Sequence, residues 1–263
     1  MALFVRLKNK RKSLSRKLKI FQRRVKNSAE AFRVGESAYK LTIEAIGPFE
    51  VAYRHGTTDD DQIRHSFDND AFFREVPEYV PRPTDTILDV GAHIGTFALL
   101  ASSKVPDGHV YTVEPSEENF NLLRINLTLN KCDNVTPQRV ALSDRDGVIT
   151  LYHREWNLGH SITRPTMYGE EVPTTTLQHF LDLHKIEHVD FAKFNCEGAE
   201  FPIILSTPAA QLRKMAIVLV LYHEDLAASH NHQQLVAHLS ASGFETRLAR
   251  RKDARGWIVA RRT

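Results

Sequence analysis

From residue 84 onward, short apolar runs alternate with longer segments in which apolar residues recur every three or four positions. This pattern predicts buried strands that alternate with amphipathic helices. The predicted strands cover residues 86–90, 109–114, 134–142, 147–152, 189–194 and 216–222. The predicted helices cover residues 95–103, 117–130, 175–184, 200–205 and 232–242. Such alternation favours an α/β fold with an open, mainly parallel sheet and helices on both faces.

The last two predicted strands, 244–249 and 256–261, are joined by a short polar segment at 250–255. Strands joined by so short a turn pair as a hairpin. We therefore expect an antiparallel last strand.

Residues 36–83 form a preamble of mixed character, with a predicted strand at 50–54, a polar break at 55–61 and a helical, partly buried segment after it. Three prolines, Pro77, Pro81 and Pro83, close the preamble. We expect the preamble to act as a substrate cap, together with a long irregular stretch at 153–171. Trp156 and Tyr168 in that stretch are candidates for stacking on a ring, although ordinary packing is the favoured explanation for both.

Charge sets the first residues apart. Residues 1–26 hold eleven Lys or Arg and no acidic residue, which leaves −8 for the rest of a chain whose total is +3. Apolar residues spaced for one helical face predict a basic amphipathic helix at 13–27 within an arm at 1–35. Such an arm can pack on the domain, lie on an anionic membrane or bind a protein partner, whereas contact with nucleic acid is less expected.

Composition narrows the class of protein. Hydrophobic residues make up 42% and charged residues 25%, as in soluble globular proteins. No uncharged apolar run reaches the roughly 18 residues of a transmembrane helix, and Lys and Arg interrupt the start where a secretory signal would be apolar. Two cysteines predict neither a disulfide framework nor a zinc site. We expect a cytoplasmic protein, with peripheral membrane contact through the arm as an option, and residues 84–263 as its main α/β domain.

The strongest chemical feature is the loop after the first strand of the sheet, which reads Asp89-Val90-Gly91-Ala92-His93-Ile94-Gly95. In open α/β sheets, ligands bind beyond the carboxyl ends of the strands, and glycines let the backbone turn and approach a ligand closely. The next predicted strand ends at Glu114, nineteen residues after Gly95. A carboxylate at that place accepts hydrogen bonds from both hydroxyls of a ribose.

The loop departs from the dinucleotide fingerprint, which has glycines at its first, third and sixth places. His93 and Thr96 stand at the third and sixth places, and His93 would crowd a pyrophosphate. The loop therefore disfavours NAD and favours a nucleoside without pyrophosphate, such as S-adenosylmethionine. Asp89 would then orient the methionyl ammonium.

These segments resemble the FkbM-type methyltransferase family over residues 53 to 222. Residues 55–59 are similar to its Gly-Thr-Ser-Asp-like segment, and Leu123, Asn126 and Asn130 fit its Leu-x-x-Asn-x-x-x-Asn helix. Residues 88–95, 113–120 and 140–144 match further segments, and residues 193–200 resemble its Lys-Ile-Asp-Val-Glu-Gly-x-Glu segment.

The resemblance implies a Rossmann-like methyltransferase fold, S-adenosylmethionine as cofactor with S-adenosylhomocysteine as product, and O-methylation of a sugar, glycan or secondary metabolite. Carried over by position, the cofactor-binding residues are Asp89, Gly91, Ala92, His93, Gly95, Glu114, Pro115, Ser143 and Asp144. Asn195 stands where the family pattern has Asp, and an amide serves neither as a carboxylate base nor as a charged metal ligand. We therefore expect no metal.

The acceptor side needs a base, because a hydroxyl loses its proton as it takes the methyl group. His223 and Glu197 follow predicted strands and are the leading candidates, with Asn195 as an orienting group and His160 as a further candidate. Each also has a structural explanation, such as a strand-end histidine bonded to backbone or a carboxylate at a helix N-terminus. Lys193, within a strand, is expected to pair with a carboxylate such as Asp89.

Two other functions stay open. The basic arm would suit a nucleic-acid or peptide methyltransferase, although the Asn/Asp-Pro-Pro-aromatic tetrapeptide typical of amino-group methylation is absent at 194–197. Asn195 also leaves room for a module that binds the cofactor without catalysis. The oligomeric state and the acceptor are not predicted.

Overall fold

The computed structural model describes residues 33–34, 37–38, 41–68, 70–152, 169–227 and 229–263. Its contacts divide the chain into two units, residues 1–39 and 40–263. In the first unit, strands β1 (Arg33–Val34) and β2 (Ser37–Ala38) pair antiparallel. The helix predicted at 13–27 lies outside the described residues. All that follows concerns the second unit.

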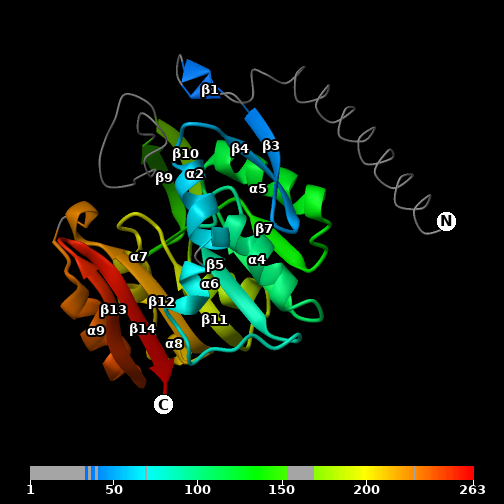
Figure 1. Ribbon diagram of the computed structural model, residues 1–263. Coiled ribbons are helices and arrows are strands. Elements are labelled where there is room, and N and C mark those ends of the chain that lie inside the picture. The colour runs from blue at the N-terminus through cyan, green and yellow to red at the C-terminus, as the bar shows by residue number, and fades with distance from the viewer. Residues whose placement is uncertain (1–32, 35–36, 39–40, 69, 153–168, 228) are drawn as a thin grey trace, which may run out of the picture. The chain divides into compact units, whose positions relative to one another are not determined.

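A seven-stranded sheet forms the centre of the second unit (Figure 1), in the order β13-β14-β12-β11-β5-β6-β7. Its strands are β5 (Thr86–Val90), β6 (His109–Val113), β7 (Val135–Gln138), β11 (Val189–Phe194), β12 (Met215–His223), β13 (Phe244–Lys252) and β14 (Arg255–Arg262). β14 runs antiparallel to both of its neighbours, β12 and β13, while the other six strands share one direction. The predicted Rossmann-like fold with an antiparallel last strand is confirmed.

Side chains alternate across the sheet and meet different helices on its two faces. Leu88 and Phe194 point into a core shared with α6 (Leu177–Leu183), α7 (Glu200–Ser206), α8 (Ala209–Leu212) and α9 (His232–Ala241). On the opposite face, Phe191 packs against Phe97 of α4 (Thr96–Lys104) and Phe73 of α3 (Ala71–Arg74). Helices therefore cover both faces, as the alternating pattern predicts.

Helix α5 (Glu117–Asn130) has the predicted bounds. Ser116 is its N-cap and accepts a hydrogen bond from the backbone N–H of Asn119 at 3.4 Å. The cap satisfies a donor that the first turn leaves without a helical partner. It also fixes where the loop after β6 ends and the helix starts.

A second, three-stranded sheet differs from the sequence prediction. Its order is β8-β10-β9, from β8 (Ala141–Ser143), β9 (Gly147–Tyr152) and β10 (Gly169–Thr176). The single strand predicted at 134–142 is in fact two strands, β7 and β8, which belong to different sheets. The apolar run in the sequence does not reveal that its two halves pair with strands of different sheets. β10 begins inside the stretch predicted to be irregular. The sequence does not indicate this strand, because Val172 is its one buried apolar residue and gives little periodicity.

The preamble folds as a hairpin of β3 (Leu41–Ile46) and β4 (Phe49–Arg54), followed by α2 (Asp59–Ile63), the π-helix η2 (Arg64–Asp68) and α3. Strand β4 lies along α5. Oδ1 of Asn126 accepts from the Ala52 N–H at 2.7 Å, and Oδ1 of Asn130 accepts from the Glu50 N–H at 2.9 Å. Their amide groups donate back to the carbonyls of the same two residues. The Leu-x-x-Asn-x-x-x-Asn pattern therefore docks a strand edge onto a helix.

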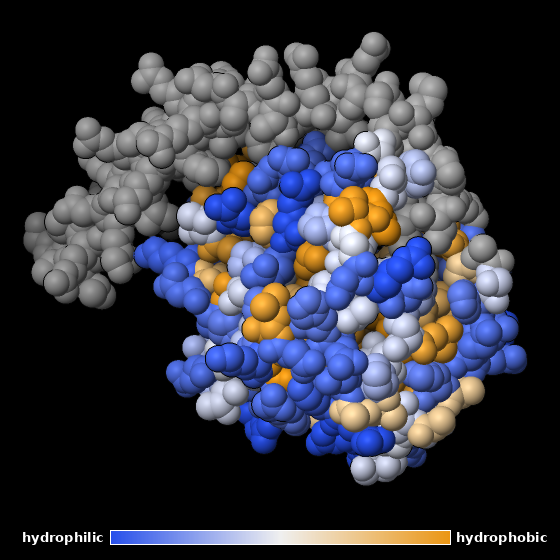
Figure 2. Space-filling model, turned by 180° about the vertical axis from the view of Figure 1, so that it is seen from behind, coloured by the Kyte–Doolittle hydropathy of each residue, from blue (hydrophilic) through white to orange (hydrophobic). Residues whose placement is uncertain are grey.

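Within the described ranges, no helix is both long and apolar enough to cross a membrane. Figure 2 shows a face on which hydrophilic residues dominate and hydrophobic ones gather in small separate areas. That distribution is usual for a surface in contact with water.

Candidate functional site

A cavity lies where the strand order reverses. From β5 the chain continues to β6 on one side and later returns to β11 on the other, so the carboxyl ends of β5 and β11 diverge around a crevice. Residues at or just after the carboxyl ends of β5, β6 and β11 line this cavity. An apolar part of its wall comes from Val90, Val113, Ala141, Leu142 and Leu151. Polar groups from the predicted site complete it.

Two glycines shape the loop after β5. Gly91 and Gly95 have φ of 80° and 87°, a region that side chains disfavour. A Cβ at position 91 would overlap the carbonyl oxygen of Asn195, and one at position 95 would overlap the side chain of Leu123. The glycines thus let the loop after β11 and helix α5 approach the β5 loop. Gly91 lines the cavity.

Glu114 is buried at the end of β6 and lines the cavity. Its carboxylate accepts from the His93 N–H at 2.7 Å, the Ser116 N–H at 3.0 Å and Nδ2 of Asn119 at 3.4 Å. Burial raises the pKa of Glu114 to about 7, and these hydrogen bonds oppose the rise. A ligand that donates hydrogen bonds here would favour the charged carboxylate.

His93 lines the cavity, and its backbone has φ of 55°. Its Nε2 atom lies 3.4 Å from Oδ1 of Asp59. Burial lowers the pKa of His93 to about 4. The positive charges of Arg54 and Lys193 also lower this pKa, whereas the negative charge of Asp59 raises it. The ring is therefore neutral near pH 7. A proton on Nε2 faces Asp59, and this leaves Nδ1 as an acceptor. Nδ1 is buried and has no hydrogen-bond partner among the described residues.

Asp89 is fully buried and is not part of the cavity wall. Its Oδ1 is 2.6 Å from Nζ of Lys193, so the predicted ion pair is confirmed. The same ammonium donates to the Gly91 carbonyl at 3.1 Å and lies over the rings of Phe72 and Phe97. Asp89 thereby supports the loop from behind, and its contact with a methionyl ammonium stays a prediction.

The remaining cofactor candidates differ in whether they line the cavity. Pro115 lines the cavity, whereas Ala92 and Gly95 are not part of its wall. Ser143 donates to Oδ1 of Asp144 at 3.1 Å just beyond Ala141 and Leu142, which do line it. Their roles at the cofactor stay predictions.

The acceptor candidates that follow β11 come together on the same cavity. Asn195 and Glu197 both line it. The backbone turns sharply here, with φ of 51° at Glu197 and 100° at Gly198, before α7 begins. The Asn195 N–H donates to the Val90 carbonyl at 3.0 Å, which ties this turn to the end of β5.

His223, at the end of β12, lies behind Glu197. Its Nε2 is 3.7 Å from Oε1 of Glu197, and its Nδ1 is 2.9 Å from Oε1 of the fully buried Glu200. Glu200 also accepts from the backbone N–H groups of His223 and Gly198 at 2.7 and 3.0 Å. Burial lowers the pKa of His223, but hydrogen bonding and attraction to the two carboxylates outweigh it, and the net direction is upward.

The FkbM methyltransferase domain model matches residues 89–246, more than half of the chain. The chain belongs to the FkbM methyltransferase family. Membership confirms the predicted family, the predicted fold class and the predicted cofactor, S-adenosylmethionine. The cavity fits that cofactor, because the Glu114 carboxylate and Nδ1 of His93 are buried acceptors and S-adenosylmethionine carries hydroxyl and ammonium donors.

Two curated relatives align with this FkbM-family chain. The 2-O-methyltransferase NoeI of Sinorhizobium fredii is 25% identical over 50% of the chain and 60% of its own length. The 31-O-demethyl-FK506 methyltransferase FkbM of Streptomyces tacrolimicus is 31% identical over 47% of the chain and 43% of its own length. The chain thus spans about half the length of the curated relatives it matches.

A crystal structure of EvdMO1 is 17% identical, with a TM-score of 0.49 over 92% of the chain and 47% of that protein. The fold assignment rests on the strand order described above.

Sequence reasoning missed several contributors to the site, among them Asn119, Glu200 and Arg54. Asn119 lines the cavity, Glu200 holds His223, and Arg54 lies behind Asn119 at 2.6 Å. Asn119 and Glu200 fall within segments that resemble the family, so a residue-by-residue comparison could have identified them. His160 lies outside the described residues, and its role stays a prediction. Within the described part of the chain, no group of three or more His, Cys, Asp or Glu side chains is placed to hold a metal ion.

Proposed function

We propose that the protein transfers a methyl group from S-adenosylmethionine to a hydroxyl group of a small-molecule or glycan acceptor. The observation that carries this proposal is that Asn195 and Glu197 line the same cavity as Gly91 and Glu114. A cofactor end and a candidate base are therefore parts of one site. The names of the two curated relatives, which describe 2-O-methylation and methylation of 31-O-demethyl-FK506, support a hydroxyl acceptor.

At the cofactor end, Glu114 would accept hydrogen bonds from the ribose hydroxyls, and the apolar wall around Val113 and Leu142 would cover the adenine. His93 would accept a further hydrogen bond through Nδ1. When bound, S-adenosylmethionine supplies a methyl group that is already activated by its sulfonium. The work left to the protein is alignment of the acceptor and removal of its proton.

At the acceptor end, Glu197 is the candidate base because its carboxylate lines the cavity and 28% of the side chain is exposed. Glu197 would accept the proton that the acceptor hydroxyl loses as it takes the methyl group. His223 is a positioning residue, since Glu200 fixes its ring and its Nε2 faces Glu197. Asn195 would orient the acceptor with its amide group.

The test combines cofactor binding with turnover. Purified protein is titrated with S-adenosylhomocysteine by calorimetry and then assayed for acceptor-dependent formation of S-adenosylhomocysteine with hydroxylated sugars, oligosaccharides and macrolides. Glu197→Gln keeps the size of the side chain but removes the base. We expect the variant to bind S-adenosylhomocysteine as the wild type does and to lose about 100-fold or more in kcat.

Two results would contradict the proposal. Failure of the wild-type protein to bind S-adenosylhomocysteine would remove the cofactor assignment for this cavity. Unchanged turnover in Glu197→Gln would exclude Glu197 as the base. A larger loss of kcat in His223→Asn than in Glu197→Gln would instead give the proton-accepting role to His223.

A further inference from the structure

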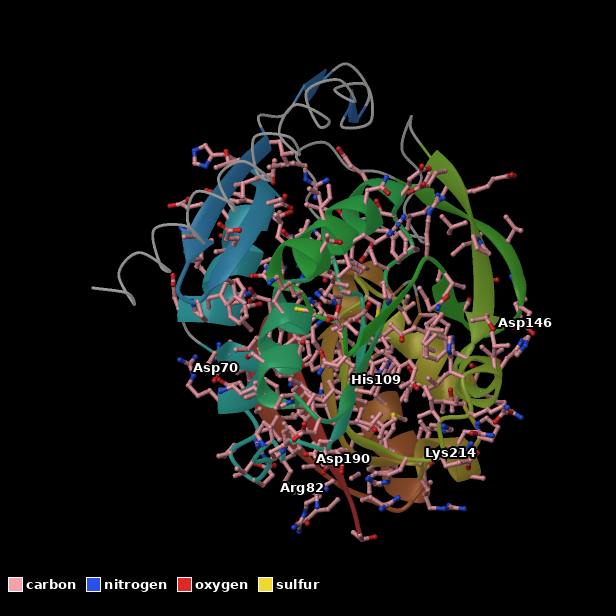
Figure 3. All side chains as sticks on the ribbon, turned by 90° about the vertical axis from the view of Figure 1, so that its right-hand side faces the viewer. Asp70, Arg82, His109, Asp146, Asp190 and Lys214 are labelled. Atoms are coloured by element: carbon pink, nitrogen blue, oxygen red, sulfur yellow. The ribbon has the colours of Figure 1, made fainter. Side chains whose placement is uncertain are left out.

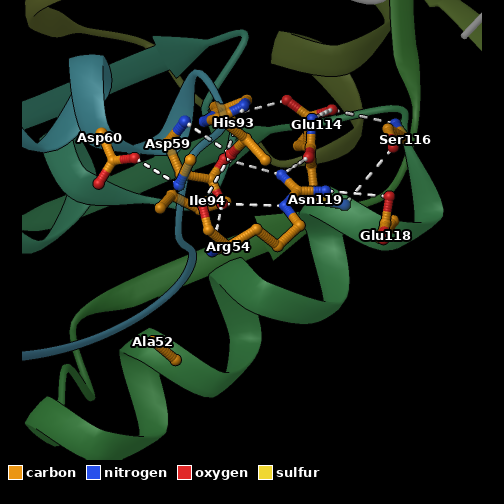
Figure 4. A network of polar contacts seen from close by, with 12 residues as sticks. Ala52, Arg54, Asp59, Asp60, His93, Ile94, Glu114, Ser116, Glu118 and Asn119 are labelled. Carbon is orange, nitrogen blue, oxygen red and sulfur yellow. Dashed lines mark hydrogen bonds and ion pairs between the residues drawn. The ribbon is translucent and has the colours of Figure 1, made fainter. Parts of the chain in front are cut away.

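A buried ion network lies behind the cofactor end of the cavity (Figure 4), and its central residue precedes the region that the family model matches. Arg54, the last residue of β4, is fully buried. Its guanidinium forms a two-pronged pair with Asp59, with Nε to Oδ2 and Nη2 to Oδ1 both at 2.9 Å. Nη1 lies 3.0 Å from Oε2 of Glu118. A charge this deeply buried is tolerated when it is paired and hydrogen-bonded on all sides.

The first branch of the network reaches Glu114 through Asn119. Nη2 of Arg54 donates to Oδ1 of Asn119 at 2.6 Å, which settles the orientation of that amide. The Nδ2 group then has to point the other way, and it donates to Oε1 of Glu114 at 3.4 Å. Without the guanidinium, Oδ1 of Asn119 loses its partner, and the amide is no longer held in the position from which Nδ2 reaches Glu114.

The second branch reaches His93 through Asp59. The carboxylate of Asp59 accepts from the backbone N–H of Arg54 at 2.8 Å as well as from its side chain. It is therefore held firmly where Nε2 of His93 lies 3.4 Å from Oδ1. An anion at that place selects the tautomer with the proton on Nε2, so that the buried Nδ1 stays an acceptor.

The backbone geometry supports the same coupling. Asn126 of α5 donates to the Ala52 carbonyl at 3.1 Å and to the Ile94 carbonyl at 2.7 Å. One side chain thus joins β4 to the loop that carries Gly91 and His93. The strand that supplies Arg54 and the loop that faces the cofactor are fixed to the same helix.

We propose that Arg54 is a positioning residue of the cofactor site, which holds Glu114 through Asn119 and His93 through Asp59. The segment from β4 to α2 is then part of the cofactor pocket although it lies before the family-matched region. This inference rests on the proposed function in one respect, namely that Glu114 accepts the ribose hydroxyls. A lysine cannot replace Arg54, because it lacks the planar fork that contacts Asp59 and Asn119 together.

The test compares two ligands, S-adenosylhomocysteine and its 2′-deoxy analogue, by calorimetry. We expect wild-type protein to bind the deoxy analogue about tenfold more weakly, because a hydrogen bond to a charged acceptor is lost. In Arg54→Lys the preference for the ribose should shrink to about twofold, because Glu114 is no longer held. Asn119→Ala, a smaller change to the same branch, should reduce the preference in the same way, and it serves as the second variant if Arg54→Lys does not fold.

Arg82→Lys is the matched control. Arg82 makes ion pairs with Asp85 and Asp190 and is itself largely exposed, and Figure 3 shows Arg82 close to Asp190 at the end of the sheet where β5 begins. This control should keep the wild-type preference.

Equal weakening of both ligands in Arg54→Lys and Asn119→Ala would mean a merely structural role and would overturn the inference while leaving the cofactor assignment intact. If wild-type protein bound neither ligand, the cofactor assignment itself would fail, and the inference with it.

Discussion

At the scale of single residues, Glu114 carries the clearest consequence for solution behaviour. Its carboxylate is buried against three donors, and burial still raises its pKa to about 7. The folded protein therefore holds this proton at pH values where the unfolded chain has released it. The resulting stabilisation is complete below about pH 4.5 and is lost as the pH rises through 7, a change on the order of 3 kcal/mol.

We therefore predict that Glu114→Gln removes a fall in the free energy of unfolding between pH 5 and pH 8. Urea denaturation of ligand-free wild type and variant at the two pH values gives the difference, and other titrating groups cancel between the two proteins. Identical pH dependence in both proteins would show that Glu114 is charged in the folded state throughout. The variant should also bind S-adenosylhomocysteine more weakly, since an amide is a poorer acceptor for two hydroxyls.

The sequence predicts part of the site at this scale for a simple reason. Parallel strands end at one edge of a sheet, so Gly91, Glu114, Asn195 and Glu197, which all follow strands, were expected to meet, and they do. The role of Arg54 was not predictable in this way. Its contact with Asn119 joins residues 65 positions apart, and no local periodicity records such a pair.

At the scale of elements, strand β4 pairs with β3 along one edge, and helix α5 supplies hydrogen-bond partners along the other edge. Asn126 is fully buried and bonds to Ala52 on both its N–H and its carbonyl, and to the Ile94 carbonyl. We predict that Asn126→Ala destabilises the protein by about 2–4 kcal/mol, because buried backbone groups lose their partners. Thr128→Ala, on the exposed side of the same helix, should cost less than about 0.5 kcal/mol. Urea denaturation of both variants measures the difference.

A result in which Asn126→Ala is no more destabilised than Thr128→Ala would mean that water readily replaces the amide, and that β4 is not held by this residue. The sequence indicated the Asn pattern by resemblance, but its purpose became clear from the register of β4 on the helix. The bounds of α5 were predicted well because its cap and its period agree. The strand predicted at 134–142 was wrong as a single element, because its two halves pair in different sheets.

At the scale of the whole molecule, the sequence predicts boundaries after residues 35 and 83, whereas the contacts divide the chain after residue 39. Each boundary suggests a different shortened protein. A chain that begins at residue 40 keeps β4, Arg54 and the complete cavity wall. A chain that begins at residue 84 loses Arg54, Asp59 and the strand that Asn126 binds. The hydrogen bonds of the preamble to α5 argue that residues 41–83 are a structural part of the methyltransferase unit, whatever their role in choosing a substrate.

We predict that a protein of residues 40–263 folds and binds S-adenosylhomocysteine with wild-type affinity, while it loses attraction to anionic membranes. The deleted segment carries the eleven Lys and Arg residues of positions 1–26. Each basic residue near an anionic surface contributes about 1 kcal/mol, and salt screens that attraction. Co-sedimentation with vesicles of phosphatidylserine and phosphatidylcholine, at low and high salt, compares the full chain with the shortened one.

Vesicle binding by the full chain that falls with salt, and is absent from residues 40–263, would assign the arm to a membrane surface. Equal sedimentation of the two proteins would exclude that role for the arm. The S-adenosylhomocysteine titration serves as the internal control, because a shortened chain that has lost its fold would fail both measurements. An arm that acts apart from the cavity should affect where the enzyme works and leave cofactor affinity unchanged.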